Sequence, residues 1–298
     1  MKKMIWLFSL VLIWSNFVNG QSSQTAEESS LLWKISGKNL TAPSYLFGTI
    51  HMIGKNDYFF TETMQEAFKA AEQVTFEINM EEMSDMSAMM PIMMKAFMSN
   101  NTTLKDLLDE ASYKIVEDHF SKIGLPLMLL ERIKPMFLSA LSAEDLMKAQ
   151  TDNEEVVSYE FELMDMARSQ NKTVDGLETA AYQMSMFDSI PYDVQARMLV
   201  ASIQQNDQGA DEDYRKMIDL YKAQDITAMG ALITEEGDEL ANYEQLLLTN
   251  RNRNWIPVMA NMMSKKATFF AVGAGHLGGS KGVIALLREA GYTVTSMR

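Results

Sequence analysis

The apolar and polar positions divide the chain into a strand-rich start, a long helical middle and a strand–helix–strand end. At the start, residues 31–36 and 45–49 predict two strands, and the Gly- and Pro-containing stretch between them predicts a hairpin. A helix is expected from about residue 63 to 71. The apolar run VTFEINM, residues 74–80, then predicts a short buried strand.

Helical spacing dominates the next two hundred residues, apart from KTVDGLET at 172–179, which predicts another short strand. The helices expected in this part are 84–98, 113–123, 143–149, 160–170, 191–204, 211–223 and 251–264. After them, ATFFAVGA predicts a strand, 281–290 a helix that stops at Gly291, and YTVTSMR a last strand. The pattern predicts an α/β class with a central mixed β-sheet. Residues 31–298 would form one domain with a large helical insertion at about 83–265.

The first twenty residues have the pattern of a secretory signal peptide. Lys2 and Lys3 precede an uninterrupted apolar stretch from Met4 to Trp14, and small or polar residues follow up to Gly20. The stretch is shorter than the roughly 20 apolar residues of a transmembrane helix, so a retained membrane anchor is the less favoured alternative. Residues 21–30 are polar and predict a flexible lead-in. We therefore expect an exported protein, periplasmic or secreted.

Charge and cysteine content limit the classes of partner and site. The formal net charge is −14, and removal of residues 1–20, with two lysines and no acidic residue, would make it −16. Such an acidic chain without basic clusters is not expected to bind nucleic acid. The chain has no cysteine. Disulfides, a thiol nucleophile and thiolate metal ligands are therefore excluded, and any metal site must use His, Asp and Glu.

Two Gly-x-x-His motifs are the first candidate chemistry. FGTIH gives Gly48 and His51 at the end of one predicted strand, and GAGH gives Gly273 and His276, with Gly275 between them, at the end of another. Each glycine would let the chain turn, so that the histidine projects over the carboxyl edge of the sheet, where open α/β sheets bind ligands. The alternative is that each histidine only caps a loop. Repetition of the spacing favours a shared site.

Two glutamates are candidate partners of these histidines. Glu77 lies in the middle of the apolar strand VTFEINM, where an unpaired carboxylate would be costly to bury. It therefore indicates a metal ion or a cation nearby, because catalytic metals typically have about three protein ligands. The alternative places Glu77 on the exposed face of an edge strand. Glu178, after the predicted strand VDGLE, occupies a similar strand end.

Two arginines in NRNRNW lie where a helix is expected to begin. Arg251, or Arg253, could pair with a buried glutamate or stabilise an oxyanion at this helix start. The alternative is a solvated helix face. The third histidine, His119, lies in a charged helical stretch and is predicted to be a surface or packing residue.

Residues 80–100 contain eight methionines, several at helical spacing. Methionine is a flexible filler of apolar surfaces, so we expect this segment to pack in a core or along a substrate groove. Binding of cuprous copper by the thioethers is the alternative.

Taken in order, the segments LFGTIH, VTFEI, KTVDGLET, NRNRNW, AVGAGHLGGSKGV and GYTV resemble the TraB/PrgY/GumN family, whose animal relatives are the TIKI proteases. The resemblance implies a fold shared with erythromycin esterase-like proteins and a metal-dependent active site at His51, His276 and Glu77, with an arginine placed at Arg251. The family usually has Glu before the Arg-Asn pair, where this chain has Asn250.

We therefore expect an exported metal-dependent hydrolase, most simply a peptidase, that uses a divalent Mn, Co or Zn ion to activate water for attack on a peptide or protein substrate. Glu77 would bind the ion or take the proton, and Arg251 would stabilise the oxyanion. The alternatives are a protein that sequesters a peptide or haem through the histidines, without turnover, and a purely structural exported domain. The sequence leaves the metal, the substrate and the oligomeric state open.

Overall fold

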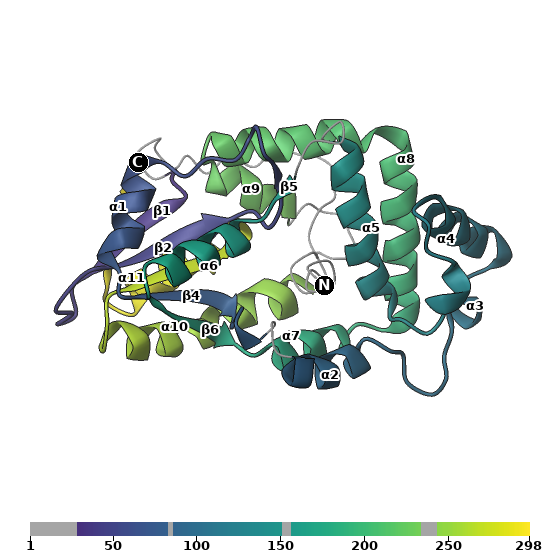
Figure 1. Ribbon diagram of the computed structural model, residues 1–298, viewed down its shortest axis with the longest axis horizontal. Coiled ribbons are helices and arrows are strands. Elements are labelled where there is room, and N and C mark those ends of the chain that lie inside the picture. Colours follow the sequence, from purple (N-terminus) through teal and green to yellow (C-terminus); the bar gives the residue numbers. More distant parts are fainter. Residues whose placement is uncertain (1–28, 83–85, 151–155, 234–242) are drawn as a thin grey trace. The chain divides into compact units, whose positions relative to one another are not determined.

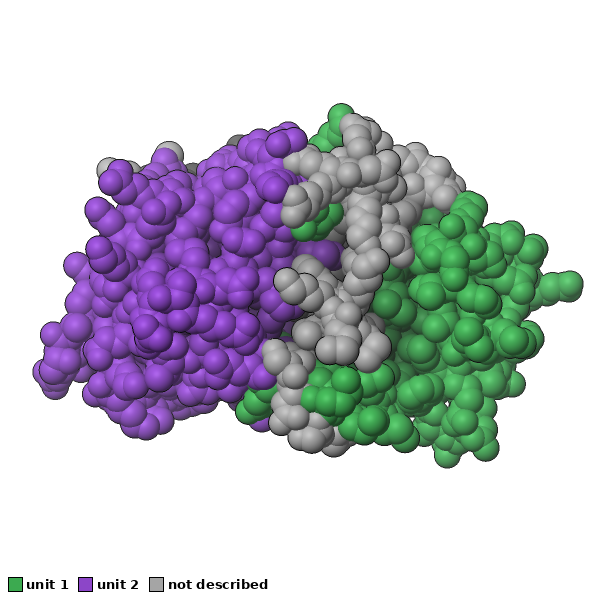
Figure 2. Space-filling view, in the orientation of Figure 1, with its two compact units in different colours: residues 1–14, 82–156, 180–215 green, residues 15–81, 157–179, 216–298 purple. Residues whose placement is uncertain are grey.

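The computed structural model describes residues 29–82, 86–150, 156–233 and 243–298. These residues form two compact units, which Figure 2 distinguishes by colour. The described parts of 15–81, 157–179 and 216–298 form what we call the sheet unit, and those of 82–156 and 180–215 form the helical unit. The predicted signal peptide and most of the lead-in lie outside the described residues, so both stay predictions.

A six-stranded mixed sheet is the centre of the sheet unit, with strand order β6-β4-β7-β2-β1-β8. Figure 1 labels β1, β2, β4 and β6 of this sheet. Strands β6, β4, β7 and β2 are parallel neighbours, and β1 is antiparallel to both β2 and β8. The predicted α/β class with a central mixed sheet is therefore confirmed, including the hairpin of β1 and β2. The strands of the sheet are β1 Leu32–Ser36, β2 Ser44–Thr49, β4 Gln73–Ile78, β6 Thr173–Glu178, β7 Thr268–Gly273 and β8 Thr293–Met297.

The middle of this sheet is buried on both faces. All six residues of β2 and the first five of β7 are buried, as expected for parallel strands covered by helices. The rings of Phe47 on β2 and Phe269 on β7 lie 5.9 Å apart and form part of an aromatic core. The helices of the unit are α1 Glu62–Ala70, α6 Tyr159–Ser169, α9 Ile226–Ile233, the π-helix Gln245–Thr249, α10 Asn250–Met263, the 3-10 turn Ala274–His276 and α11 Val283–Glu289.

The helical unit has its own core, which includes Phe120, Leu138 and Leu199. His119 belongs to this unit. It is buried, and its Nε2 lies 2.7 Å from the hydroxyl of Ser142, so the packing role predicted for it is confirmed. The helices are α2 Met86–Lys95, α3 Leu104–Leu107, α4 Glu110–Lys122, the 3-10 helix Leu127–Leu129, α5 Pro135–Gln150, α7 Ala180–Phe187 and α8 Tyr192–Lys222, which is divided between the units at residue 215. Two two-residue strands, β3 Ile53–Gly54 and β5 Val156–Val157, complete the described elements.

Two helix predictions were wrong in extent. The helices expected at 191–204 and 211–223 form one helix, α8, because no proline separates them and a lone Gly209 costs a helix only about 1 kcal/mol. Helix α5 begins eight residues before the expected 143, at Pro135, which is favourable in a first helical turn. Its opening residues are apolar on more than one side, so they lack the period of a surface helix.

The methionine-rich segment lies partly in the interior and partly on the surface. Met89 and Met98 are buried, whereas Met86, Met90 and Met94 of α2 are exposed. The packing expected for the segment therefore holds for some of its methionines only. In the described part of the chain, no helix combines the length and the apolar character needed to cross a membrane.

Candidate functional site

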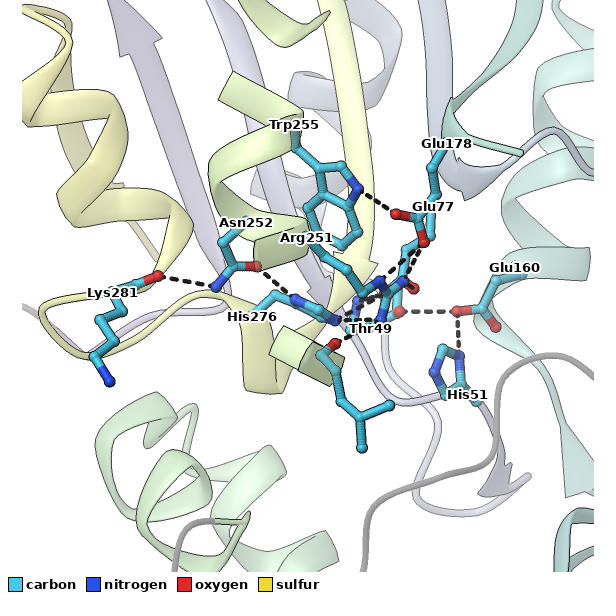
Figure 3. A network of polar contacts seen from close by, with 12 residues as sticks. Thr49, His51, Glu77, Glu160, Glu178, Arg251, Asn252, Trp255, His276 and Lys281 are labelled. Atoms are coloured by element: carbon cyan, nitrogen blue, oxygen red, sulfur yellow. Dashed lines mark hydrogen bonds and ion pairs between the residues drawn. The ribbon is translucent and has the colours of Figure 1, made fainter. Parts of the chain in front are cut away.

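The two Gly-x-x-His motifs leave the sheet side by side. Strands β2 and β7 are adjacent and parallel, and Thr49 is in register with Gly273, so both motifs cross the same carboxyl edge. His51 follows the end of β2 after one further residue, and His276 ends the 3-10 turn that follows β7. Figure 3 shows the two imidazoles among a network of polar side chains at this edge.

The glycines allow close approach. Gly48 lies inside β2, and a Cβ there would be 2.3 Å from Leu277 Cδ1 and 3.1 Å from Ala274 Cα. Only glycine therefore lets the turn that carries His276 pack on β2. Gly48, Gly273 and Gly275 all have negative φ. None of them uses the left-handed region that favours glycine, so what Gly48 and Gly273 provide is freedom from a Cβ clash.

The two imidazoles and Glu77 surround Gly273. A methyl group on Gly273 would lie 3.3 Å from Glu77 Oε1, 3.6 Å from His276 Cδ2 and 3.8 Å from His51 Nε2. Three of the residues expected to form one site are therefore brought to one point, although His51 and His276 are more than two hundred positions apart in the chain.

Glu77 is a paired carboxylate on β4 whose side chain is only 13% exposed. Its Oε1 accepts a 2.8 Å hydrogen bond from the Gly273 N–H and lies 3.6 Å from His276 Nε2, and its Oε2 is ion paired with Arg251. Burial alone raises the pKa of Glu77, but Arg251 and then the two imidazoles hold that pKa well below its usual range. β4 lies between β6 and β7, so the alternative of an exposed edge strand was wrong.

Arg251 joins this carboxylate to Glu178, the last residue of β6. Its Nε and Nη2 donate to Glu178 Oε1 at 2.9 and 2.7 Å, and Trp255 Nε1 donates to Glu178 Oε2 at 2.9 Å. The guanidinium carbon also lies 4.9 Å from the centroid of the Trp255 ring. Arg251 is only 8% exposed, so the alternative of a solvated helix face was wrong for it. Arg253 is exposed.

The helix around Arg251 begins earlier than expected. A π-helix, Gln245–Thr249, leads directly into α10, so Arg251 is not at a free helix start. Its Nη1 donates to the Leu247 carbonyl oxygen at 3.2 Å, within the π-helix. The expected contribution of a helix dipole at this position is therefore absent. A π-turn often marks a functional site, and here it places the guanidinium between two carboxylates.

Asn252 was not predicted, and it orients His276. Its Nδ2 donates to the Lys281 carbonyl oxygen at 3.0 Å, which turns its Oδ1 toward His276 Nδ1, 2.6 Å away. His276 Nδ1 must then carry the proton, and Nε2 has the lone pair, which faces Arg251 Nη1 at 3.2 Å. Burial, with Arg251 and His51, lowers the pKa of His276 to about 3 against the opposing effect of Glu77. His276 is therefore neutral near pH 7.

Glu160, in the first turn of α6, was also missed, since it belongs to no motif. Its Oε1 lies 3.0 Å from His51 Nδ1 and accepts a 2.8 Å hydrogen bond from Thr49 Oγ1. Burial lowers the pKa of His51, but Glu160 and then Glu77 raise it, and the pKa ends above its usual value. The side chain of His51 keeps 28% of its surface exposed, so it is the more accessible imidazole.

The charge and donor types of this cluster suit a divalent cation. The carboxylates Glu77, Glu160 and Glu178 outnumber the single guanidinium of Arg251, so the cluster has a formal charge of −2 with neutral imidazoles. However, within the described residues no group of three or more His, Asp or Glu side chains is arranged to hold a metal ion. Arg251 supplies a positive charge at this place, since its guanidinium lies against both His276 Nε2 and Glu77. The predicted metal ligands stay a prediction.

The chain belongs to the TraB/PrgY/gumN family, whose model matches residues 31–296, and the resemblance noted in the sequence is confirmed. A relative from Amphimedon queenslandica, described as a metalloprotease TIKI homolog, is 21% identical over 326 aligned positions. The alignment covers 92% of this chain but 63% of the relative, so the chain spans less than two thirds of that protein. No solved structure matches the chain significantly.

The lowered pKa of His276 predicts a loss of stability in acid. The unfolded chain takes up a proton at His276 near pH 6.5, whereas the folded chain does so only near pH 3. The unfolded state thus binds more protons in this window, and the free energy of unfolding should fall as pH falls, with a slope of up to about 1.4 kcal/mol per pH unit. Glu77, with its lowered pKa, adds to this loss only below pH 4.5.

Urea unfolding of the metal-free protein between pH 6.5 and 4.5 measures the contribution of His276. In His276→Gln the slope of the free energy of unfolding against pH should be smaller, because the variant lacks the proton that the unfolded wild type takes up at His276. An unchanged slope would show that His276 is protonated in the folded protein.

Proposed function

We propose that the chain is a metal-dependent hydrolase of peptide bonds, acting on a peptide or protein substrate. The observation that carries this proposal is the convergence of His51, His276 and Glu77 around Gly273. The description of the distant relative as a metalloprotease agrees with it. Export through a signal peptide, to the periplasm or the medium, is part of the same proposal and rests on the pattern of residues 1–20.

The cofactor that we propose is a divalent Mn, Co or Zn ion. His51 and His276 would hold it through Nε2, since both Nδ1 atoms face oxygen acceptors, and Glu77 would add an oxygen ligand. When bound, such an ion lowers the pKa of a water molecule toward 7 and polarises a carbonyl group. Nitrogen and oxygen ligands suit all three metals.

Arg251 and Glu77 would share the work on the substrate. Arg251 is held by two N–H bonds to Glu178, so it can donate to a developing oxyanion without losing its anchor. An oxyanion would compete with Glu77 for the guanidinium, and the pKa of Glu77 would rise as that pairing weakens. Where Glu77 takes the proton rather than binding the ion, it would therefore become a better proton acceptor at the stage when water attacks.

Metal depletion followed by reloading tests the proposed function. The purified protein is treated with a chelator, dialysed, and given Mn, Co or Zn together with a mixed peptide library, and products are identified by mass spectrometry. Cleavage should appear only with added metal. Retention of peptides without cleavage, under every metal, would favour the sequestering alternative instead. A Soret band upon addition of haem, abolished in His51→Ala, would favour its haem form.

Gly273→Ala should remove activity while leaving the fold intact. Gly273 has a φ of −53°, which alanine tolerates, so the free energy of unfolding should stay within about 1 kcal/mol of wild type. The new methyl group would lie among Glu77, His276 and His51 and displace whatever they bind, for a loss of about 100-fold in kcat/KM.

Gly230→Ala is the matched control, because a Cβ at Gly230 meets no atom within 4 Å. It should keep full activity. Wild-type turnover in Gly273→Ala would contradict the proposed position of the site.

A further inference from the structure

Glu160 lies at the carboxyl edge of β2 with every contact of its carboxylate made by a donor. It is 9% exposed and sits in the first turn of α6. Its Oε2 accepts a 3.0 Å hydrogen bond from Ser158 Oγ, and its Oε1 accepts from Thr49 Oγ1 at 2.8 Å. His51 Nδ1 is the third partner, 3.0 Å from Oε1. Two hydroxyls thus hold the carboxylate in the orientation that it presents to His51.

These contacts fix the tautomer of His51. A carboxylate offers only lone pairs, so His51 Nδ1 must carry a proton to bond with it. In the neutral ring, Nε2 is then left with its lone pair. That atom is the one that lies 3.8 Å from a Cβ position on Gly273, beside Glu77.

The support of this carboxylate comes from two elements, β2 and the start of α6. Thr49 is the last residue of β2 and lies two positions before His51, while Ser158 is the N-cap of α6 and accepts from the Phe161 N–H. One end of the carboxylate is therefore fixed to β2 and the other to the start of α6. Rotation of the His51 ring would break the Nδ1 contact. Such pairing of an imidazole with a carboxylate fixes ring orientation and raises ligand basicity where histidine binds metals.

We propose that Glu160 is a positioning residue, which holds His51 in the Nδ1–H tautomer so that Nε2 faces Glu77 and Gly273. The effect of this positioning on metal binding and turnover rests on the proposed function. The effect on the tautomer does not, and it can be measured in the metal-free protein.

Nitrogen-15 NMR of histidine-labelled protein gives a direct test, since the chain has three histidines and only three imidazole patterns must be assigned. At a pH above the raised pKa of His51, wild type should show the Nδ1–H form of His51. Glu160→Leu removes the acceptor and should shift His51 toward the Nε2–H form. Glu160→Gln keeps an acceptor oxygen and should restore the Nδ1–H form.

Two internal controls accompany the test. Glu162→Leu changes an exposed residue two positions along the same helix and should leave every pattern unchanged. His119, which is paired with Ser142 in the helical unit, should keep its own pattern in all variants. If Glu160→Leu does not fold, Thr49→Val keeps the size of its side chain and removes one of the two hydroxyls, and a partial shift is expected.

Metal binding is the second readout. The affinity for Co, followed by visible absorption, should fall about 10- to 100-fold in Glu160→Leu and much less in Glu160→Gln. An unchanged His51 tautomer in a folded Glu160→Leu protein would overturn the positioning role. The two proposals can fail separately. If the His51 tautomer shifts in Glu160→Leu but the wild-type protein neither binds Co nor cleaves peptides, the positioning of His51 is upheld and the proposed function is overturned.

Discussion

Arg251→Met should lower the free energy of unfolding by about 3–5 kcal/mol, the usual cost of removing one partner of a buried ion pair. The substitution keeps much of the side-chain volume but leaves Glu77 and Glu178 buried without their shared cation. Desolvation of the two carboxylates would then be uncompensated. Urea unfolding at pH 7 in the metal-free protein measures the change.

Arg253→Met is the matched control. Arg253 is the same residue type on the same helix, but it is exposed, so its loss should change the free energy by no more than about 0.5 kcal/mol. Equal effects in the two variants would show that Arg251 does not balance the buried carboxylates.

Arg251→Met also separates two roles of positive charge in this cluster, which are to balance the carboxylates and to assist the reaction. Loss of Arg251 removes the positive charge that lies against His276 Nε2, so the affinity for a divalent ion should rise above that of wild type. At a free metal concentration 100 times the dissociation constant, metal binding would then raise the free energy of unfolding of this variant by about 2.7 kcal/mol. Peptide cleavage should nevertheless stay low, because the proposed donor to the oxyanion is missing. A weaker metal affinity would contradict the competition between Arg251 and a bound ion.

His276→Ala should reduce kcat/KM by at least about 100-fold, because it removes a predicted ligand rather than an outer partner of one. Steady-state cleavage of a peptide identified in the library measures the loss, with circular dichroism to check the fold.

The double variant His51→Ala/His276→Ala shows whether the histidines act as one unit. If they do, the double variant should be little worse than either single variant, since effects within a unit are far from additive. Independent, multiplying losses would indicate separate roles. Cleavage at the wild-type rate in His276→Ala would remove the basis of the proposed function.

Much of the fold and part of the site could be predicted from the sequence. The apolar runs of β2, β4 and β7 and the repeated Gly-x-x-His spacing are local patterns, so the strands, the α/β class and the candidates His51, His276 and Glu77 follow from them. The apolar surroundings of Glu77 also indicated a cation, and Arg251 was among the candidates for it.

The rest depends on contacts that no local pattern encodes. Glu160 comes from a helix more than one hundred positions away from His51, and it has no motif of its own. Asn252 was visible only as part of an Arg-Asn pair, and its role depends on the Lys281 carbonyl oxygen. The reason for Gly48 was also hidden, because the atoms that exclude a side chain there belong to residues 274 and 277.

The position of β7 affects when the site can form. Residues 268–273 lie between β4 and β2 in the sheet but follow both in the chain. During synthesis, β4, which carries Glu77, and β2, which precedes His51, are made well before this interior strand. Pairing between strands so far apart in the chain forms slowly. A nascent chain that ends before residue 268 lacks His276 and the Gly273 N–H that binds Glu77, so the candidate site cannot form until synthesis is nearly complete.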